Sequence, residues 1–166
     1  MTLTAASLVR HLGLSQHPEG GYYKETYRSA GEIPASALPG IAGNRQYATA
    51  IYYLLEKGDF SAFHRIQSDE GWHFYAGGTL LVHVLSESGD YSCVKLGARL
   101  EEGETFQFVV PARAWFASEL APGTEFCLAG CTVSPGFDFA DFELAGRAAL
   151  IAQYPQHADI IGRLTR

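Results

Sequence analysis

Strand-forming residues recur in short runs along the middle of the chain, and turn-forming residues separate the runs. The runs lie at residues 47–55, 60–67, 71–75, 79–86, 91–95, 105–109, 114–118 and 126–133. Between them lie clusters of Gly, Pro, Asp and Ser, which favour tight turns. Many short strands at even spacing predict an all-β sandwich, barrel or double-sheet jelly roll.

The two ends of the chain show a different pattern. Thr4 can cap a short helix over residues 4–12, and Gly13 can end it. From Asp141 onward, apolar residues fall at helical intervals, and Pro155 divides two short helices. We expect this tail to pack across an open end of the barrel or against a partner subunit.

Residues 17–46 connect the first helix to the strand-rich region. A Pro-Glu-Gly-Gly turn precedes residues 22–27, whose aromatic content predicts a further strand. Residues 29–46 contain two Pro and three Gly and are the most loop-like segment. They form either a mobile flap or a connection between strands.

Composition and charge narrow the class of protein. The chain has 166 residues, 47% hydrophobic and 18% charged, so one compact domain is expected. The net charge is −6 and basic residues do not cluster, so nucleic-acid binding has no electrostatic support. No apolar run reaches membrane-spanning length. Cys93, Cys127 and Cys131 are too few for a disulfide framework, so we expect a reducing compartment, by default the cytoplasm.

The stretch from Gly58 to Gly77 carries the candidate chemistry. It reads Gly, five residues, His64, one residue, Ile66, three residues, Glu70, six residues, Gly. This pattern resembles the first motif of the cupin superfamily, in which a second His stands where Ile66 stands here. The resemblance implies a jelly-roll barrel, whose metal sites usually take two His and a Glu here and a third His from a later strand.

The second cupin motif is altered as well. Pro111 is kept, while Arg113 replaces a Gly, Phe116 replaces the ligand His and Leu120 replaces an Asn. Two of the four ligand positions that the resemblance implies, at Ile66 and Phe116, are therefore apolar. We predict that the protein has no cofactor and no strong metal site.

A divalent metal remains a weaker alternative. Its ligands would be His64, Glu70 and His73, with water at the vacant positions. Strand alternation from Trp72 opposes this set, because it turns His73 away from the face that the others share. On that interpretation His73 lies half-buried on the outer sheet face, where it could take part in a dimer contact.

Nearly the whole chain resembles one cupin subgroup. The matching blocks are residues 17–23, 49–55, 63–65, 69–75, 110–112 and 130–139, together with Trp115. This subgroup is the fifth cupin family, a domain of unknown function. The resemblance implies a cupin barrel, or double-stranded β-helix, with a core of about residues 47–137, a short N-terminal helix, C-terminal helices and a homodimer. It also implies likeness to the deoxysugar epimerases of rhamnose synthesis, which use a barrel His as base without metal.

His64 and Glu70 are the candidate catalytic residues. If His64 points into the barrel, alternation puts Ile66 on the same face, and a turn can bring Glu70 beside them. A carboxylate beside an imidazole raises its pKa and fixes its tautomer, which suits proton abstraction next to a carbonyl. His64 is then the base and Glu70 its orienting partner. The alternative is a pair that stabilises the barrel interior.

Aromatic and apolar residues supply the predicted ligand pocket. Trp72 and Trp115 either stack on a planar ligand or pack in the core. Apolar Ile66 and Phe116 suit an apolar or planar ligand. Gln107 can project a polar group into the pocket from a strand, although alternation leaves its direction open. Tyr22 can contact the ligand if the segment before it is a loop at the barrel mouth, and the alternative is a turn that leads into an edge strand.

These observations give three hypotheses for the function. The first is a metal-independent epimerase or isomerase that acts on a carbohydrate-like or nucleotide-linked small molecule. The second is a barrel that binds a small molecule without catalysis. The third is a metal-dependent cupin enzyme with a reduced ligand set. All three place a small molecule in the barrel and involve neither nucleic acid nor a membrane.

Overall fold

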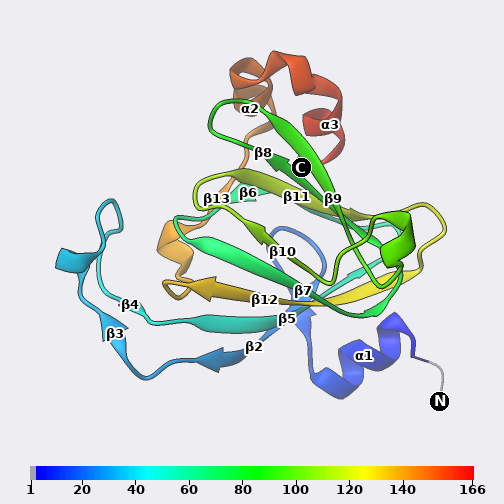
Figure 1. Ribbon diagram of the computed structural model, residues 1–166, viewed down its shortest axis with the longest axis horizontal. Helices are drawn as coiled ribbons and strands as arrows, with labels where there is room; N and C mark the ends of the chain where they lie inside the picture. Colours follow the sequence, from blue (N-terminus) through cyan, green and yellow to red (C-terminus); the bar gives the residue numbers. More distant parts are fainter. Residues whose placement is uncertain (1–2) are drawn as a thin grey trace.

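Two packed antiparallel sheets form the body of the molecule in the computed structural model, which describes residues 3–166 (Figure 1). The larger sheet has six strands in the order β1-β2-β5-β12-β7-β10, and the smaller has five in the order β13-β6-β11-β8-β9. From β5 to β8, and again from β10 to β12, consecutive strands alternate between the sheets. This winding is that of a jelly roll, so the predicted fold class is confirmed.

The strand bounds agree closely with the predicted runs. The larger sheet contains β1 (Ser15–Gln16), β2 (Tyr22–Arg28), β5 (Thr49–Glu56), β12 (Phe126–Ser134), β7 (Asp69–Gly77) and β10 (Gln107–Val110). The smaller sheet contains β13 (Glu143–Leu144), β6 (Phe60–Arg65), β11 (Trp115–Leu120), β8 (Leu80–Leu85) and β9 (Tyr91–Leu96). β7 begins at Asp69, before the predicted run of residues 71–75, so Glu70 lies on the strand.

The main core lies between the two sheets. It is built from alternate, inward-facing residues of strands in both sheets, and its largest buried members include Tyr53, Trp72 and Phe116. The short strands thus bury their apolar side chains in one common core, which is the arrangement that their spacing predicted.

Helix α1 (Ala5–Leu12) covers part of the outer face of the larger sheet (Figure 1). The Thr4 side chain caps its first turn, and Gly13 ends it with a left-handed φ of 65°, as the sequence predicts. Leu8 is buried against Leu54 of β5, so the apolar stripe of the helix fixes its position on the sheet.

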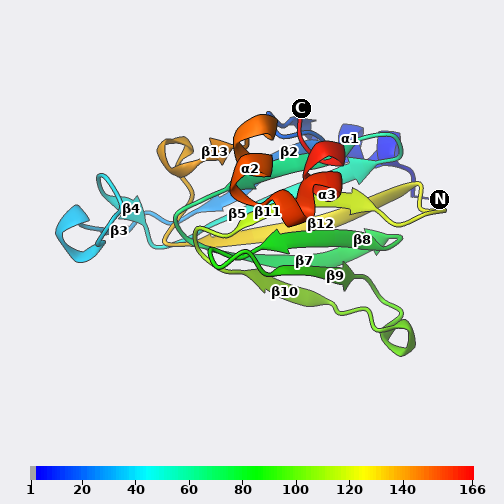
Figure 2. The same cartoon turned by 90° about the horizontal axis from the view of Figure 1, so that it is seen from above.

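The C-terminal helices α2 (Arg147–Gln153) and α3 (Ala158–Arg163) lie over the outer face of the smaller sheet (Figure 2). Leu150 and Ile161 pack there against Phe63 and Trp115. The tail was expected at an open end of the barrel or against a partner. It packs on the sheet face instead, because the large apolar side chains on that face would otherwise contact water.

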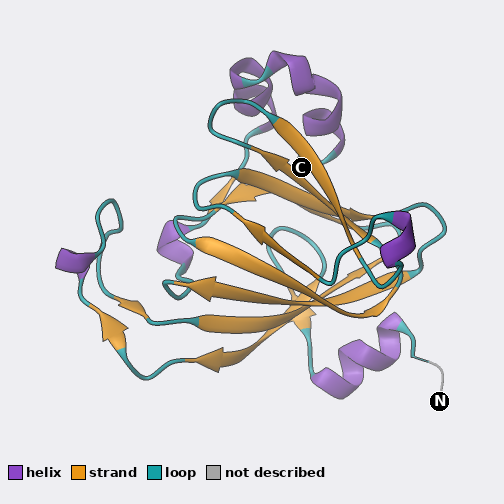
Figure 3. Cartoon of the chain, viewed as in Figure 1, coloured by secondary structure: helices purple, strands orange, loops and turns teal. Residues whose placement is uncertain are grey.

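Residues 29–46 form a projecting arm (Figure 3). The arm contains β3 (Glu32–Ile33), a short 3-10 helix (Ala35–Ala37) and β4 (Arg45–Gln46), and β3 pairs with β4. At its base the buried Arg45 guanidinium binds both carboxylate oxygens of Asp141, each at 2.7 Å. The loop-like segment is therefore a connection between strands with a small hairpin of its own.

Within residues 3–166, no helix has the length and apolar content that crossing a bilayer would require.

Candidate active site

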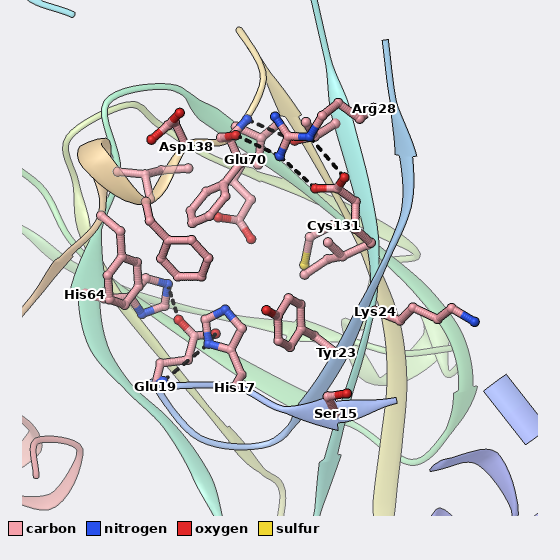
Figure 4. Close-up of a pocket in the computed structure, with 18 of the residues that line it drawn as sticks. Ser15, His17, Glu19, Tyr23, Lys24, Arg28, His64, Glu70, Cys131 and Asp138 are labelled. Atoms are coloured by element: carbon pink, nitrogen blue, oxygen red, sulfur yellow. Dashed lines mark hydrogen bonds and ion pairs between the residues drawn. The ribbon is translucent and has the colours of Figure 1, made fainter. Parts of the chain in front are cut away.

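An open cavity of about 600 Å³ lies inside one end of the barrel. Strands β1, β2, β5, β6, β7 and β12 contribute to its wall, and residues 137–139 and Phe142 cover one side. Figure 4 shows polar side chains that reach into it from facing walls. The structure brings together His64, Ile66 and Glu70 in this wall.

His64 forms a buried ion pair, and its partner is Glu19. The His64 Nε2 atom lies 2.7 Å from Glu19 Oε2, while Nδ1 lies 2.7 Å from the carbonyl oxygen of Ala62. A carbonyl oxygen accepts only, so Nδ1 carries a proton and both ring nitrogens are engaged. The ring itself packs between Phe116, with centroids 4.0 Å apart, and Phe142 at 5.4 Å.

The electrostatics of this pair favour the charged forms. Burial by itself would lower the pKa of His64, but the charge and hydrogen bond of Glu19 raise it above its ordinary value. Burial likewise opposes ionisation of Glu19, and the pull of His64 brings the Glu19 pKa below its usual range. The two contacts and the direction of both shifts favour an imidazolium that faces a carboxylate, which leaves the ring no free lone pair to accept a proton.

A tight turn delivers Glu19 to the cavity. The Gly20 carbonyl accepts from the Tyr53 hydroxyl at 2.8 Å, and the Glu19 carbonyl accepts from Ala62 N at 2.8 Å. Gly20 and Gly21 have φ values of 117° and 74°, which favour glycine. A Cβ on Gly20 would collide with the Phe60 carbonyl and the Arg166 side chain. The two glycines therefore let the turn lie close enough for Glu19 to reach His64.

His17 begins the same turn and faces the cavity. Its Nδ1 accepts a hydrogen bond from Glu19 N at 3.2 Å, so the ring proton of the neutral form lies on Nε2. Burial lowers the pKa of His17 against the attraction of Glu19. The ring is held edge-on against Tyr23, with centroids 4.5 Å apart. His17 thus offers the cavity a neutral N–H donor.

Glu70 enters the cavity from β7, opposite His17 and Tyr23 (Figure 4). Its side chain is buried and takes part in none of the ion pairs found within residues 3–166. Burial raises the pKa of Glu70 to about 7, although the charge of His64 draws it the other way. A carboxyl group with this pKa exchanges its proton readily near neutral pH.

The sequence matches a family over most of its length. The family described as Cupin superfamily (DUF985) covers residues 6–145. This chain belongs to that family. The cupin resemblance that the Gly58–Gly77 motif predicted is thereby confirmed, and the family description assigns no reaction.

Proteins that are similar to most of this chain have names that state no activity. A hypothetical protein from Leishmania major is 36% identical, with a TM-score of 0.91 over 98% of this chain and 99% of its own. Protein SO0799 from Shewanella oneidensis is 41% identical, with a TM-score of 0.90 over 99% of each chain. The uncharacterized protein YML079W of Saccharomyces cerevisiae is 34% identical in an alignment of 144 residues that covers 81% of this chain and 71% of that protein.

More distant cupins share the fold alone. Oxalate decarboxylase from Bacillus subtilis superposes with a TM-score of 0.56 at 15% identity, over 90% of this chain and 36% of that enzyme.

The metal set typical of cupins is not assembled here. Across residues 3–166 no three His, Cys, Asp or Glu side chains converge in a way that could hold a metal ion. His64 uses both nitrogens within the protein. His73 lies on the opposite side of β7 from Glu70, where its nitrogens contact Thr132 Oγ1 at 3.2 Å and Gln107 Nε2 at 3.1 Å. The described residues therefore do not fit a metal centre.

Several predicted pocket residues lie elsewhere. Trp72 points inward but is buried in the main core, and Trp115 packs under the C-terminal helices on the outer sheet face. Phe116 backs the His64 ring without lining the cavity. Gln107 lies on the exposed edge strand, and Tyr22 faces outward towards α1. Strand alternation places Trp115, Gln107 and Tyr22 on faces that point away from the cavity, whereas Trp72 and Phe116 face inward and are packed in the main core.

The pairing of His64 with Glu70 is corrected in one respect. The carboxylate that orients His64 is Glu19, which is 45 positions earlier in the sequence, and Glu70 faces the cavity on its own. Glu19 and His17 were missed as site residues, although the Pro-Glu-Gly-Gly turn between His17 and Tyr22 was noted. The signal that could have identified Glu19 as a site residue is a charged residue directly before two glycines.

Proposed function

We propose that this protein is a metal-independent enzyme that moves protons on a small molecule, in the manner of an isomerase or epimerase. The observation that carries the proposal is Glu70, a buried carboxyl group without an ion-pair partner among residues 3–166, which faces a cavity. Burying such a group costs several kcal/mol of solvation, on the order of 2–7 for a polar group, so a use for it is expected.

Glu70 is the proposed general base. It takes the proton from a carbon next to a substrate carbonyl, and the electron pair of the broken C–H bond moves to give an enolate. The enolate oxygen accepts a hydrogen bond from His17 Nε2–H on the facing wall. In an isomerisation, a proton passes from the hydroxyl on the first carbon to the enolate oxygen, and Glu70 then gives its proton to the former carbonyl carbon, so that the carbonyl group has moved and Glu70 is ionised again. In an epimerisation, water gives a proton to the opposite face of the same carbon, and Glu70 releases its own proton to the hydroxide that is left. A base with a pKa near the working pH performs such transfers best.

Glu19 and His64 position His17, the hydrogen-bond donor that acts together with Glu70. The Glu19 backbone N–H fixes the His17 tautomer, and the Glu19 carboxylate is held in turn by His64. The imidazolium of His64 also adds positive charge to the cavity wall, which favours the developing enolate.

The cavity favours an uncharged, carbohydrate-like substrate over a nucleotide-linked one. Its volume of about 600 Å³ is that of a small-molecule site. Arg28 lines the mouth, but its donors already bind Glu25, the Gln46 side chain and the Phe137 carbonyl, at distances from 2.7 to 3.2 Å. A diphosphate would find this guanidinium occupied.

Hydrogen exchange tests the proposal directly. Aldoses and ketoses, and in a second set sugar nucleotides, are incubated with the protein in D₂O, and loss of carbon-bound hydrogen is followed by NMR. We expect exchange with at least one substrate, and Glu70→Gln should slow it by about 10²–10⁴-fold. Asp138→Asn removes another carboxylate from the cavity mouth and serves as the control. Exchange that is equally fast in Glu70→Gln contradicts the proposal.

The second candidate is a ligand-binding barrel without catalysis. The ion pair of Glu19 and His64 favours this second candidate. Each group satisfies the other, so no reaction is needed to explain why the pair is present. A thermal-shift screen over the same sugars separates the two, since a bound ligand stabilises by mass action. Stabilisation by a sugar that never exchanges hydrogen supports the binding barrel.

We also propose that the protein acts as a homodimer in the cytoplasm. Cys93, Cys127 and Cys131 are free thiols, which suits a reducing compartment. Light scattering during gel filtration measures the subunit number.

A further inference from the structure

We infer that Asp59 and Arg166 act together as positioning residues, which hold the turn of residues 17–21 against the barrel and so fix Glu19 beside His64. The inference deepens the proposed function, since it concerns the same cavity. Its contacts lie outside that cavity, on the far side of the turn.

Asp59 connects the turn to Arg166. One carboxylate oxygen of Asp59 accepts from Gly21 N at 2.8 Å, and the other accepts from Arg166 Nη2 at 2.6 Å. The same Nη2 donates to the Phe60 carbonyl at 2.9 Å, and the guanidinium lies over the Phe60 ring at 4.4 Å. The turn is thus bonded to the start of β6, the strand that carries His64.

Arg166 is placed by its own segment. The Leu164 carbonyl accepts from Phe63 N at 2.8 Å, so the residues after α3 run beside β6. Arg166 Nε also approaches the Glu19 carbonyl at 3.4 Å. A residue far along the chain therefore touches the peptide group of Glu19 itself, although it contributes nothing to the cavity lining.

The turn of residues 17–21 has little room to shift and form other contacts when these bonds are lost. Gly20 lies so close to the Phe60 carbonyl and Arg166 that it has no room for a Cβ. On the cavity side, Ala62 contacts both Glu19 and His64. Its N–H donates to the Glu19 carbonyl, and its carbonyl accepts from His64 Nδ1. Movement of the turn away from β6 would therefore separate the Glu19 carboxylate from the His64 ring.

The test is the pH titration of the His64 imidazole, followed by NMR in the intact protein without any ligand and assigned with His64→Gln. In Arg166→Ala and Asp59→Ala we expect the His64 midpoint to fall by about 0.5–1 unit, a three- to tenfold weaker proton affinity. The Gly21 amide should exchange with solvent about tenfold faster. Arg166→Lys keeps the positive charge but loses the planar guanidinium with its several N–H donors. It should therefore give an intermediate midpoint for the His64 titration.

The direction of the shift identifies its cause. Removing the positive charge of Arg166 would by itself raise the His64 midpoint, so a fall in Arg166→Ala reports displacement of Glu19. The control is Arg163→Ala, which removes a guanidinium that binds Glu119 at 2.7 and 2.9 Å from α3 and does not touch the turn.

A midpoint in Arg166→Ala that is unchanged or raised, with a loss of thermal stability equal to that of Arg163→Ala, overturns the inference. Because this titration needs no substrate, its outcome does not depend on the hydrogen-exchange experiment. A protein that shows the expected shift but exchanges no substrate hydrogen refutes the proposed function alone.

Discussion

Replacing Glu70 by Gln should make the protein more stable at neutral and alkaline pH. In the folded protein, burial raises the pKa of Glu70 from 4.5 to about 7. The folded state therefore holds a proton that the unfolded chain releases, and stability falls as pH rises between these two values. A difference of about 2.5 units at about 1.36 kcal/mol per unit gives a penalty of about 3 kcal/mol above pH 7. Gln is a neutral isostere and escapes that penalty.

Chemical denaturation of both proteins from pH 4 to pH 9 measures the effect. We expect equal stabilities near pH 4 and a gap that opens to about 3 kcal/mol above pH 7. In a chain of this size the gap corresponds to a rise of about 6–12 °C in Tm. A gain in stability when a charged side chain is replaced is typical of a functional site.

The matched control is Glu104→Gln at the other end of the barrel. Glu104 is also buried, but its oxygens accept from Thr79 Oγ1 at 2.6 Å and from Arg99 Nη2 at 2.8 Å. That variant should lose about 1–3 kcal/mol, as expected for a hydrogen-bonded charge. If Glu70→Gln is also destabilised at pH 8, Glu70 has a stabilising partner and the argument for a poised base is wrong.

Two further predictions concern the turn that carries Glu19. Glu19→Gln should cost about 3–5 kcal/mol near neutral pH, because it leaves His64 buried without its partner. The deficit should shrink at low pH, where Glu19 is protonated in the wild type, and at high pH, where His64 loses its proton; denaturation across pH checks both. Gly20→Ala should lose more than about 2 kcal/mol of unfolding free energy from its left-handed φ and the collisions at its Cβ. Gly162→Ala, in a helix with open space around it, should instead gain about 0.5–1 kcal/mol, and a destabilised Gly162→Ala or a tolerated Gly20→Ala would refute this view of the backbone.

The barrel could be predicted because its signals are local. Turn residues and strand formers are read within a few positions, and the spacing from Gly58 to Gly77 resembles the first cupin motif except at Ile66. Helix α1 was equally accessible, since its cap and its end are adjacent to it in sequence.

The contacts of the candidate site were harder to predict because they join distant segments. His64 pairs with a residue of the first turn, and nothing in either segment specifies which carboxylate comes closest. The two Trp residues illustrate the same limit: both are aromatic and buried, yet one fills the main core and the other lies under the C-terminal helices.

The sequence by itself therefore determined the jelly roll, its family and the candidates His64 and Glu70. Only the tertiary structure decided their roles. Closing the two sheets brings the turn of residues 17–21 onto β6, where Glu19 takes the place beside His64. Glu70 is left to face the cavity, and burial raises its pKa against the attraction of His64. Burial and ion pairing depend on which segments meet in space, and that information is distributed over the whole fold.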